Sequence, residues 1–314
     1  MNHEHIDILN HFTLENIPDL DQVVLAALER FQITAPPEIP EDLYKRPLVV
    51  GSGNAEATGR IIFESTDAVF ASESNFETKL KSIPAIDGVV LVSASGAKHA
   101  PIIARRAKEY NKQVTLITNT ENSEAKHELS LESGDHELVF PKNREPYTYN
   151  TSTYMGMILG HTKEDPAKIY QFIKEVVDLI DVSSFARFNK FYLIVPTEFS
   201  GIIRMLQVKF IELFGRNIAR DVETSEYVKH ATTVVPANEL FLSFGYENVL
   251  WGEKKNRVNI PLPEWAGYGT IMAIAYYVIG KIQKQHPPYF KEHIAKYTEE
   301  ISKVFGETIS PIVD

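Results

Sequence analysis

The sequence contains no cysteine. This absence excludes disulfide bonds, thiolate metal sites and cysteine nucleophiles, and it is compatible with the reducing cytoplasm, where we expect the protein to reside. The chain also lacks any dense run of Lys or Arg, and its formal net charge is −10. Because nucleic-acid binding needs clustered basic side chains that displace counterions, we expect no nucleic-acid partner.

Long apolar runs are missing as well. The longest candidate, residues 269–282, is interrupted and falls short of the roughly 20 apolar residues that a membrane span requires. The N-terminus is acidic and polar, where a signal peptide would be basic and then apolar. We therefore expect no membrane partner. His3 and His5 lie close together, but two histidines without further ligands do not make a metal site, so we expect neither a metal nor a cofactor.

The chain does have enough apolar residues for a packed core, since 44% of its 314 residues are hydrophobic. Short apolar runs predict strands over residues 47–51, 67–71, 88–92, 113–118 and 135–140, and helical patterns lie between several of them. In the helix expected after residue 98, Ala100, Ile103, Ala104 and Ala107 fall on one face. Such alternation predicts an α/β fold with a parallel sheet covered on both faces.

A similar layout returns in the second half of the chain. A strand over 191–195, a turn over 196–201 and a helix over 202–214 repeat the pattern of residues 48–62. We expect further strands at 239–244 and 257–260, terminal helices at 266–284 and 288–305, and an opening helix from 6 to 30. The prediction is two tandem, doubly wound, flavodoxin-like halves: a helical segment 1–45, a first domain 46–184 and a second domain 185–314.

The junction between the strand at 88–92 and its helix carries Ser93, Ser95 and Gly96. The first turn of a helix has unpaired amides and the positive end of the helix dipole, so an anion placed there meets several donors. Two serines beside a glycine would add hydroxyl donors and allow close approach. The alternative is that the serines cap the helix, as serine commonly does. This segment alone leaves both interpretations open.

A second glycine turn follows the strand at 47–51. Gly51-Ser-Gly53-Asn-Ala-Glu56 resembles part of a dinucleotide fingerprint, and Glu73 lies twenty residues beyond Gly53. Glu56, however, stands where the third glycine belongs, and its charge would repel a pyrophosphate. This argues against a nicotinamide enzyme. Both loops follow parallel strands, so we expect them at the same edge of the sheet, where ligands bind in such folds.

The segment Ser93-Ala-Ser95-Gly96-Ala-Lys98 resembles the Ser-x-Ser-Gly-x-Thr loop of the sugar isomerase (SIS) domain family, which holds the phosphate of a phosphosugar. The resemblance extends over about residues 46–305. Its two copies per chain are similar to phosphosugar isomerases, to the isomerase half of glucosamine-6-phosphate synthase and to fructosamine-6-phosphate deglycase. It implies a phosphorylated sugar as ligand, a homodimer, and phosphate-binding residues that include Gly53, Asn54, Ser93, Ser95, Gly96 and Lys98.

Lys98 departs from the family pattern, because it stands where the family has threonine. An ammonium could pair with the phosphate where a hydroxyl usually donates, or Lys98 could be a solvated residue of the first helical turn. Residues 145–153 resemble the family's segment that helps to enclose the sugar, with Glu145, Thr151 and Ser152 as the sugar-binding residues. The alternative for this segment is a capped helix.

The resemblance also implies catalytic residues in the second half. Exchange between an aldose and a ketose moves a proton between C1 and C2, so it needs a carboxylate base, and a histidine suits ring opening. Glu212 matches the base and His230 the histidine, with Glu223 and Glu226 as alternatives for the base. In this family the histidine can come from a neighbouring subunit.

The sequence predicts an enzyme, an aldose-ketose sugar-phosphate isomerase. A deglycase of phosphorylated amino-sugar adducts and a non-catalytic phosphosugar sensor are the alternatives. The Schiff-base lysine of the synthase has no close match here. Lys291 lies in roughly the corresponding region, and Lys303 lies nearer the C-terminus.

Overall fold

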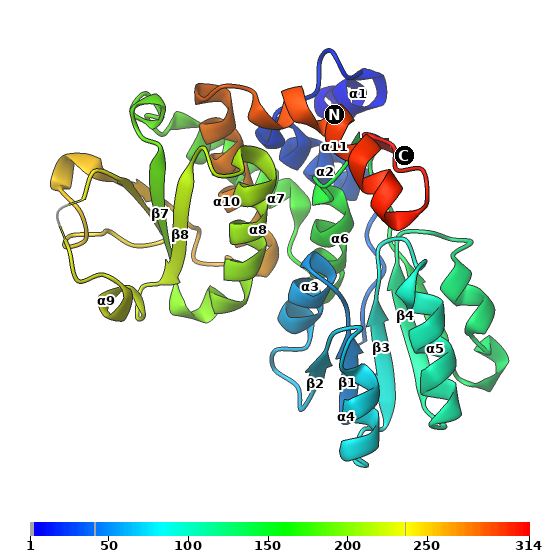
Figure 1. The fold of residues 1–314 in the computed structure, drawn as a ribbon. Helices are drawn as coiled ribbons and strands as arrows, with labels where there is room; N and C mark the ends of the chain where they lie inside the picture. The colour runs from blue at the N-terminus through cyan, green and yellow to red at the C-terminus, as the bar shows by residue number, and fades with distance from the viewer. Residues whose placement is uncertain (1–2, 41, 236) are drawn as a thin grey trace. The chain divides into compact units, whose positions relative to one another are not determined.

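The computed structural model describes residues 3–40, 42–235 and 237–314, which divide into two compact units (Figure 1). Unit 1 consists of residues up to 33, residues 143–152 and residues 164–314, and unit 2 consists of residues 34–142 and 153–163. Both contain a parallel β-sheet with helices, so the predicted α/β class is confirmed. The units interleave along the chain, and the contiguous domains 46–184 and 185–314 remain a prediction.

Unit 2 contains a five-stranded parallel sheet in the order β2-β1-β3-β4-β5, the flavodoxin-like order. Its strands are β1 (Pro47–Val50), β2 (Val69–Ala71), β3 (Gly88–Val92), β4 (Gln113–Thr118) and β5 (His136–Val139). Its helices are α3 (Asn54–Ile62), α4 (Phe76–Ser82), α5 (His99–Glu109) and most of α6 (Thr151–Thr162), with short 3-10 turns at Glu124–Glu128 and Leu131–Ser133.

Alternate residues of these strands point to opposite faces of the sheet, and both faces are covered. On one face Leu48 and Leu91 pack in a buried cluster with α4 and α5. The four residues predicted on one face of the helix after Lys98 (Ala100, Ile103, Ala104 and Ala107) all belong to that cluster. On the other face α3 approaches so closely that a Cβ on Gly59 would lie 2.7 Å from Val49 Cγ1. The sheet is therefore doubly wound, as predicted.

Unit 1 contains a four-stranded parallel sheet in the order β10-β9-β7-β8. Its strands are β7 (Lys190–Val195), β8 (Ala219–Thr224), β9 (Leu240–Phe244) and β10 (Arg257–Ile260), and a small antiparallel pair joins β6 (Glu145–Pro146) to β11 (Ile312–Val313). Its helices are α1 (Glu4–His11), α2 (Leu20–Ile33), α7 (Pro166–Glu175), α8 (Ile203–Phe214), α9 (Val228–Ala231), α10 (Tyr268–Gln285) and α11 (Tyr289–Phe305). Short 3-10 turns lie at Val177–Leu179, Phe185–Arg187, Thr197–Ile202 and Lys254–Asn256.

The prediction of a single helix over residues 6–30 is wrong. The chain forms α1 and α2 with an irregular segment between them, which contains Pro18. In that segment Asn16 Oδ1 accepts hydrogen bonds from the backbone amide and the hydroxyl of Thr13, which fold the chain into a turn. Pro18 has no amide to donate, so it cannot continue a helical ladder from the preceding residues.

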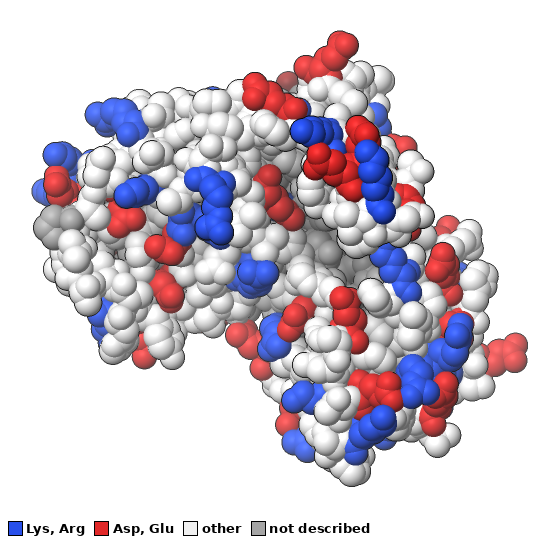
Figure 2. All heavy atoms as spheres, in the orientation of Figure 1, with Lys and Arg blue, Asp and Glu red and all other residues white. Residues whose placement is uncertain are grey.

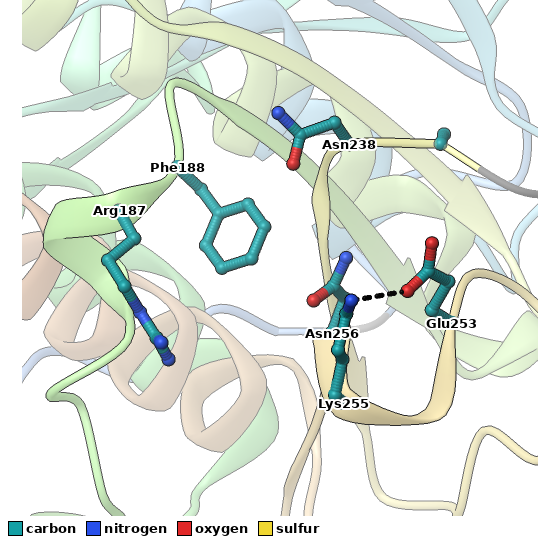
Figure 3. A pocket seen from close by; sticks show the side chains of 7 residues that line it. Arg187, Phe188, Asn238, Glu253, Lys255 and Asn256 are labelled. Carbon is teal, nitrogen blue, oxygen red and sulfur yellow. Dashed lines mark ion pairs between the residues drawn. The ribbon is translucent and has the colours of Figure 1, made fainter.

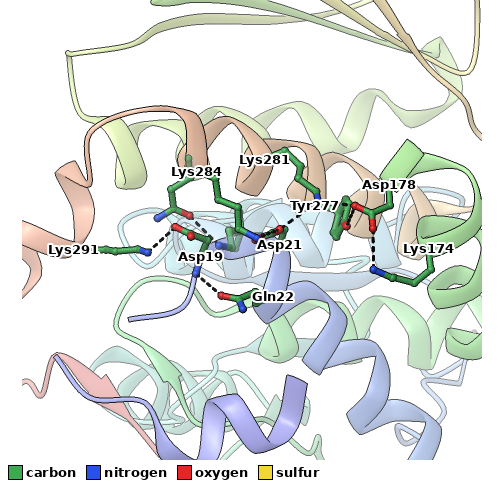
Figure 4. A network of polar contacts seen from close by, with 11 residues as sticks. Asp19, Asp21, Gln22, Lys174, Asp178, Tyr277, Lys281, Lys284 and Lys291 are labelled. Atoms are coloured by element: carbon green, nitrogen blue, oxygen red, sulfur yellow. Dashed lines mark hydrogen bonds and ion pairs between the residues drawn. The ribbon is translucent and has the colours of Figure 1, made fainter. Parts of the chain in front are cut away.

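Ion pairs tie α2 to α10 within unit 1 (Figure 4). Asp21 is nearly buried on α2, and its carboxylate lies 2.5 Å from Lys284 Nζ and 3.8 Å from Lys281 Nζ. Lys281 also contacts Asp178 at 2.6 Å. The backbones are close as well, because a Cβ on Gly280 would lie 2.1 Å from the amide nitrogen of Asp21. Glycine is therefore required where these helices meet.

Charges of both signs are interspersed on the surface drawn in Figure 2, and the described residues form no extended basic patch on that face. Within the described ranges, no helix is long and apolar enough to cross a membrane.

Candidate functional site

The predicted phosphate loop lies in unit 2 at the carboxyl end of β3, beside the carboxyl end of β1. From β1 the chain moves to β2 on one side, while β3 lies on the other side, so the strand order reverses between β1 and β3. In open α/β sheets, ligands bind beyond the carboxyl ends of the strands at such a reversal. The loop after β1 and the loop after β3 therefore flank the position where this fold holds a ligand.

The loop after β3 is fixed by the backbone of its neighbours. The Ser93 amide donates to the Ile117 carbonyl at 2.9 Å, and the Ala125 amide donates to the Gly96 carbonyl at 2.8 Å. Gly96 has a φ of +60°, and a Cβ there would lie 2.4 Å from the Cβ of Ser123. Only glycine combines this left-handed backbone with so close a neighbour.

The serines stabilise the loop itself and leave the start of the helix uncapped. The Ser93 hydroxyl accepts a hydrogen bond from the Gly96 amide at 3.2 Å, and the Ser95 hydroxyl accepts one from the Ala97 amide at 3.3 Å. The N-cap position of α5 is Lys98, and among the described residues no side-chain cap bond is made at this position. The geometry therefore disfavours the interpretation that these serines cap the helix.

Lys98 begins α5 with φ +58° and ψ −106°. Gly53 begins α3 with nearly the same values, φ +58° and ψ −122°. The two loops thus have the same backbone conformation where their helices begin. In the loop after β3, however, the residue is Lys98, which has a Cβ, and for such a residue this conformation is strained. Such strain in a non-glycine residue is typical of functional loops.

A pocket of about 180 Å³ lies against both loops. Three of the predicted phosphate-binding residues line it, namely Ser93, Ser95 and Lys98. The other three, Gly53, Asn54 and Gly96, do not line it; Asn54 is 8% exposed at the start of α3, and its side-chain oxygen has no hydrogen-bond partner in the described structure. The pocket also contains four polar side chains that the sequence did not assign to it: Ser52, Glu73, His99 and Tyr154.

The predicted sugar-binding residues form a buried helix cap in unit 1. The carboxylate of Glu145 accepts hydrogen bonds from the amides of Thr151 at 2.6 Å and Ser152 at 2.7 Å. Burial raises the pKa of Glu145, although these hydrogen bonds and the charge of Lys209 oppose the shift. Glu145 is 4% exposed, and Thr151 and Ser152 are fully buried. The geometry corresponds to the capped helix that was the alternative for this segment.

Glu212 lies in a different pocket, which belongs to unit 1 and has a volume of about 420 Å³. The Nζ atom of Lys209, one turn earlier on α8, lies 2.7 Å from a Glu212 carboxylate oxygen. Burial raises the pKa of Glu212, and the charge of Lys209 opposes the shift. A carboxylate held close to a single cation in a largely apolar wall is suited to general base catalysis near neutral pH.

Lys209 itself has no solvent exposure. Besides Glu212, its ammonium donates to the carbonyls of Thr148 at 2.8 Å and Tyr149 at 2.7 Å. Thr148 has a φ of +75°, an unfavourable value for a β-branched residue, and it lines the same pocket. Lys209 therefore connects Glu212 to a strained turn of the pocket wall.

His230 does not lie in this pocket. It is exposed on α9, and Val228 of the same helix packs against Tyr192 and Ile194 of β7. Phe210 of α8 packs against Phe191, which points to the opposite face of the strand, so α8 and α9 cover opposite faces of the sheet. Within one chain, Glu212 and His230 are therefore not brought together.

A different histidine shares the pocket with Glu212. His293, on the first turns of α11, lines the pocket, and its Nδ1 lies 2.7 Å from the carbonyl oxygen of Tyr289. A carbonyl only accepts, so Nδ1 carries the proton and Nε2 is left as the acceptor in the neutral ring. The sequence offered no motif for His293, because it reaches the pocket only through the packing of α11 on α8.

Of the two alternatives for the base, Glu223 is on β8 and Glu226 in the turn before α9, and neither lines the pocket of Glu212. Lys291 lies 2.8 Å from Asp19 in an ion pair (Figure 4), and the exposed Lys303 pairs with Glu299 one turn away. Among the residues that the structure describes, no three His, Asp or Glu side chains are grouped as a metal site would need.

A further pocket of about 480 Å³ in unit 1 holds none of the predicted residues (Figure 3). Phe188, Asn238 and Asn256 line it, and each lies shortly before a strand of the second sheet. It therefore lies at the amino ends of the strands, opposite to the edge where parallel sheets bind ligands.

Comparison with solved structures identifies the fold. The C-terminal domain of glucosamine-fructose-6-phosphate aminotransferase from Francisella tularensis superimposes with a TM-score of 0.58 at 13% identity, over 92% of this chain and 95% of that chain. Glucosamine-6-phosphate deaminase from Thermotoga maritima gives a TM-score of 0.59 at 16% identity, over 86% and 93%. Tagatose-6-phosphate ketose/aldose isomerase from Escherichia coli gives 0.56 at 11% identity, over 92% and 94%.

This chain shares the fold of these phosphosugar enzymes. The neighbours thus agree with the resemblance stated from the serine loop, and they extend over nearly the whole chain. No family model matches the sequence, and no curated protein matches it. The shared fold is therefore found here with a sequence that is only 11 to 16% identical to those of these structural neighbours.

Proposed function

We propose that the chain is a sugar-phosphate isomerase that binds the phosphate of its substrate with Ser93, Ser95, Lys98 and the uncapped start of α5. The observation that carries the proposal is the position of this loop at the strand-order reversal, where the described residues make no side-chain cap bond at Lys98, the N-cap of α5. The His99 amide at the start of α5, two hydroxyls and an ammonium are donors of the kind that a phosphate ester requires; the Ala100 amide donates to the Ala97 carbonyl, and Pro101 has no amide.

We assign proton transfer to Glu212 of unit 1, which lines a different pocket from that of the phosphate loop of unit 2. Isomerisation of an aldose moves the C2 proton to C1 through an enediol. One carboxylate can take up this proton from C2 and return it to C1. Lys209 holds the Glu212 carboxylate in place, and burial raises its pKa toward the range in which a base is effective. We assign ring opening to His293 or to a His230 contributed by another subunit. The homodimer and the cytoplasmic location remain predictions.

The neighbours support the choice of substrate class. Their names specify 6-phosphates of tagatose, fructose and glucosamine, and the tagatose enzyme is a ketose/aldose isomerase. Because the identities are 11 to 16%, the particular sugar and the reaction of this chain are part of the proposal.

The test is a thermal-shift screen of hexose, pentose and amino-sugar phosphates, followed by product analysis with every phosphate that stabilises the chain. We expect aldose-ketose exchange with at least one of them, and a loss of at least about 100-fold in kcat for Glu212→Gln. Glu264→Gln, an exposed change of the same kind, is the control. Release of a free amine would instead identify a deglycase, and stabilisation without turnover would identify a sensor. Unchanged kcat in Glu212→Gln would contradict the assigned mechanism.

A further inference from the structure

The pocket beside the serine loop contains a carboxylate, although it is proposed to bind a phosphate. Glu73 follows β2, lines the pocket with Ser52 and Ser95, and keeps 41% of its side chain exposed. A carboxylate only accepts hydrogen bonds and repels a phosphate dianion. Its presence therefore needs a role other than phosphate binding.

Ser52, like Glu73, presents hydrogen-bond acceptors to the pocket. The Ser52 hydroxyl donates its proton to Glu73 Oε2 at 2.5 Å. Because a serine hydroxyl has one proton, it then offers only lone pairs to a ligand. Ser52 and Glu73 together form a pair of acceptors on the β1 and β2 side of the pocket.

The other side of the pocket consists of donors. The hydroxyls of Ser93 and Ser95 each accept from a loop amide, and in the described structure neither donates its proton to a protein group. Lys98 lines the same side and adds an ammonium. The pocket is thus divided into a donor side, which suits an anion, and an acceptor side, which suits a hydroxyl or ammonium group.

Two further titratable side chains line the pocket, Tyr154 and His99. His99 lies near Glu73. Its Nε2 lies 4.0 Å from Glu73 Oε2, and its side chain is 61% exposed. All binding is compared at pH 7, where the amino group of an amino sugar still carries its proton and can pair with a carboxylate.

We propose that Glu73, through its pairing with Ser52, is a specificity-determining residue that selects phosphate esters carrying a hydroxyl or ammonium donor near the phosphate. It discriminates against inorganic phosphate and against simple alkyl phosphates, and it favours amino-sugar phosphates most, because an ammonium pairs with the carboxylate. This inference rests on the proposed phosphate binding by the serine loop and specifies the class of ligand taken there.

The experiment measures dissociation constants of the full chain at pH 7 for inorganic phosphate, methyl phosphate, glucose 6-phosphate and glucosamine 6-phosphate. For the wild type we expect glucosamine 6-phosphate to bind at least about tenfold more tightly than methyl phosphate. Glu73→Gln should weaken the binding of glucosamine 6-phosphate several-fold and strengthen the binding of methyl phosphate and inorganic phosphate. The preference for glucosamine 6-phosphate over methyl phosphate should then disappear. Glu64→Gln, an exposed change of equal charge in the same unit, should leave all four constants unchanged.

Ser52→Ala provides a second variant should Glu73→Gln fail to fold. It removes one hydrogen-bond acceptor and should reduce the preference for glucosamine 6-phosphate. It should strengthen the binding of inorganic phosphate less than Glu73→Gln does. If the wild type and both variants bind the phosphate esters with the same preference, the role of Glu73 is overturned, but the proposed phosphate binding by the serine loop is not. A wild type that binds none of the four compounds overturns the proposed phosphate site and this inference together.

Discussion

At the scale of single residues, Lys98 is the most unusual position of the phosphate loop. It holds φ +58° and ψ −106°, a conformation that the chain assigns to glycine at the equivalent position of the first loop. A strained backbone persists when the surrounding structure or the function requires it. Because Lys98 lines the pocket, its charge offers a reason for keeping lysine there.

The variant Lys98→Gly separates strain from charge. Glycine relieves the strain, so we expect the free energy of unfolding in urea to rise by about 1 kcal/mol, while sugar-phosphate affinity falls because the ammonium is lost. Lys98→Ala keeps the strain and loses the charge, so affinity should fall without a gain in stability. A loss of stability in Lys98→Gly would show that this conformation is not strained.

Glu212 and Lys209 predict a pH dependence. Burial raises the pKa of Glu212 and the charge of Lys209 opposes the shift. Since the base must be ionised, kcat/KM should fall as the pH drops through this raised pKa, above the value of about 4.3 of an ordinary glutamate. Lys209→Met removes the opposing charge, so the acid limb of the profile should move to higher pH. A limb at the same pH in both proteins would exclude Glu212 as the titrating base.

At the scale of elements, the segment before α6 acts as a structural cap. Glu145 receives two backbone amides at the start of the helix, and its neighbours Thr151 and Ser152 are fully buried. A buried carboxylate with two charge-assisted hydrogen bonds stabilises the fold, and the 4% exposure of Glu145 leaves a sugar hydroxyl little access to it.

Glu145→Gln tests this role. The amide group of Gln cannot accept from both backbone donors, so we expect the free energy of unfolding to fall by about 2 kcal/mol, with the KM for sugar phosphate unchanged. The exposed Glu264→Gln should change neither quantity. A raised KM at unchanged stability would instead assign Glu145 to the sugar, as the family resemblance implies.

The strands and most helices could be predicted from the sequence, because alternating apolar runs and helical spacing depend on neighbours in the chain. The strand at 257–260 was predicted at its observed bounds, and the helix at 288–305 to within one residue. Interactions between distant segments could not be predicted. Lys209 bonds to carbonyls 60 and 61 residues earlier in the sequence, and this contact attaches residues 143–152 to unit 1.

The candidate site was predictable to a similar extent. Ser93, Ser95 and Lys98 belong to a continuous motif, and they line one pocket. Glu73 was noticed only for its distance from Gly53, since its contact with Ser52 depends on the pairing of β1 with β2. His293 enters the pocket of Glu212 through helix packing, which leaves no local motif in the sequence.

At the scale of the whole molecule, the two sheets differ in the element that follows the third strand, which is the position of the proposed anion site. Their first four strands have the same relative order, but a helix follows the third strand only in unit 2. In unit 1 the third strand, β9, leads into residues 245–256, which contain a 3-10 turn and no α-helix. Arg257 closes this loop by donating to the carbonyls of Leu250 at 2.8 Å and Trp251 at 3.0 Å. A phosphate cradle formed by a loop and a helix start is therefore expected after the third strand of unit 2 alone.

This difference predicts one phosphate bound per chain at that position, on a molecule whose net charge of −10 disfavours anions in general. The most direct measurement is calorimetric titration of the full chain with glucose 6-phosphate and with glucose, for the wild type and for the double variant Ser93→Ala, Ser95→Ala. We expect the wild type to bind the phosphate ester and not glucose, and the double variant to bind at least about tenfold more weakly. Equal dissociation constants for wild type and double variant would show that the serine loop does not hold the phosphate.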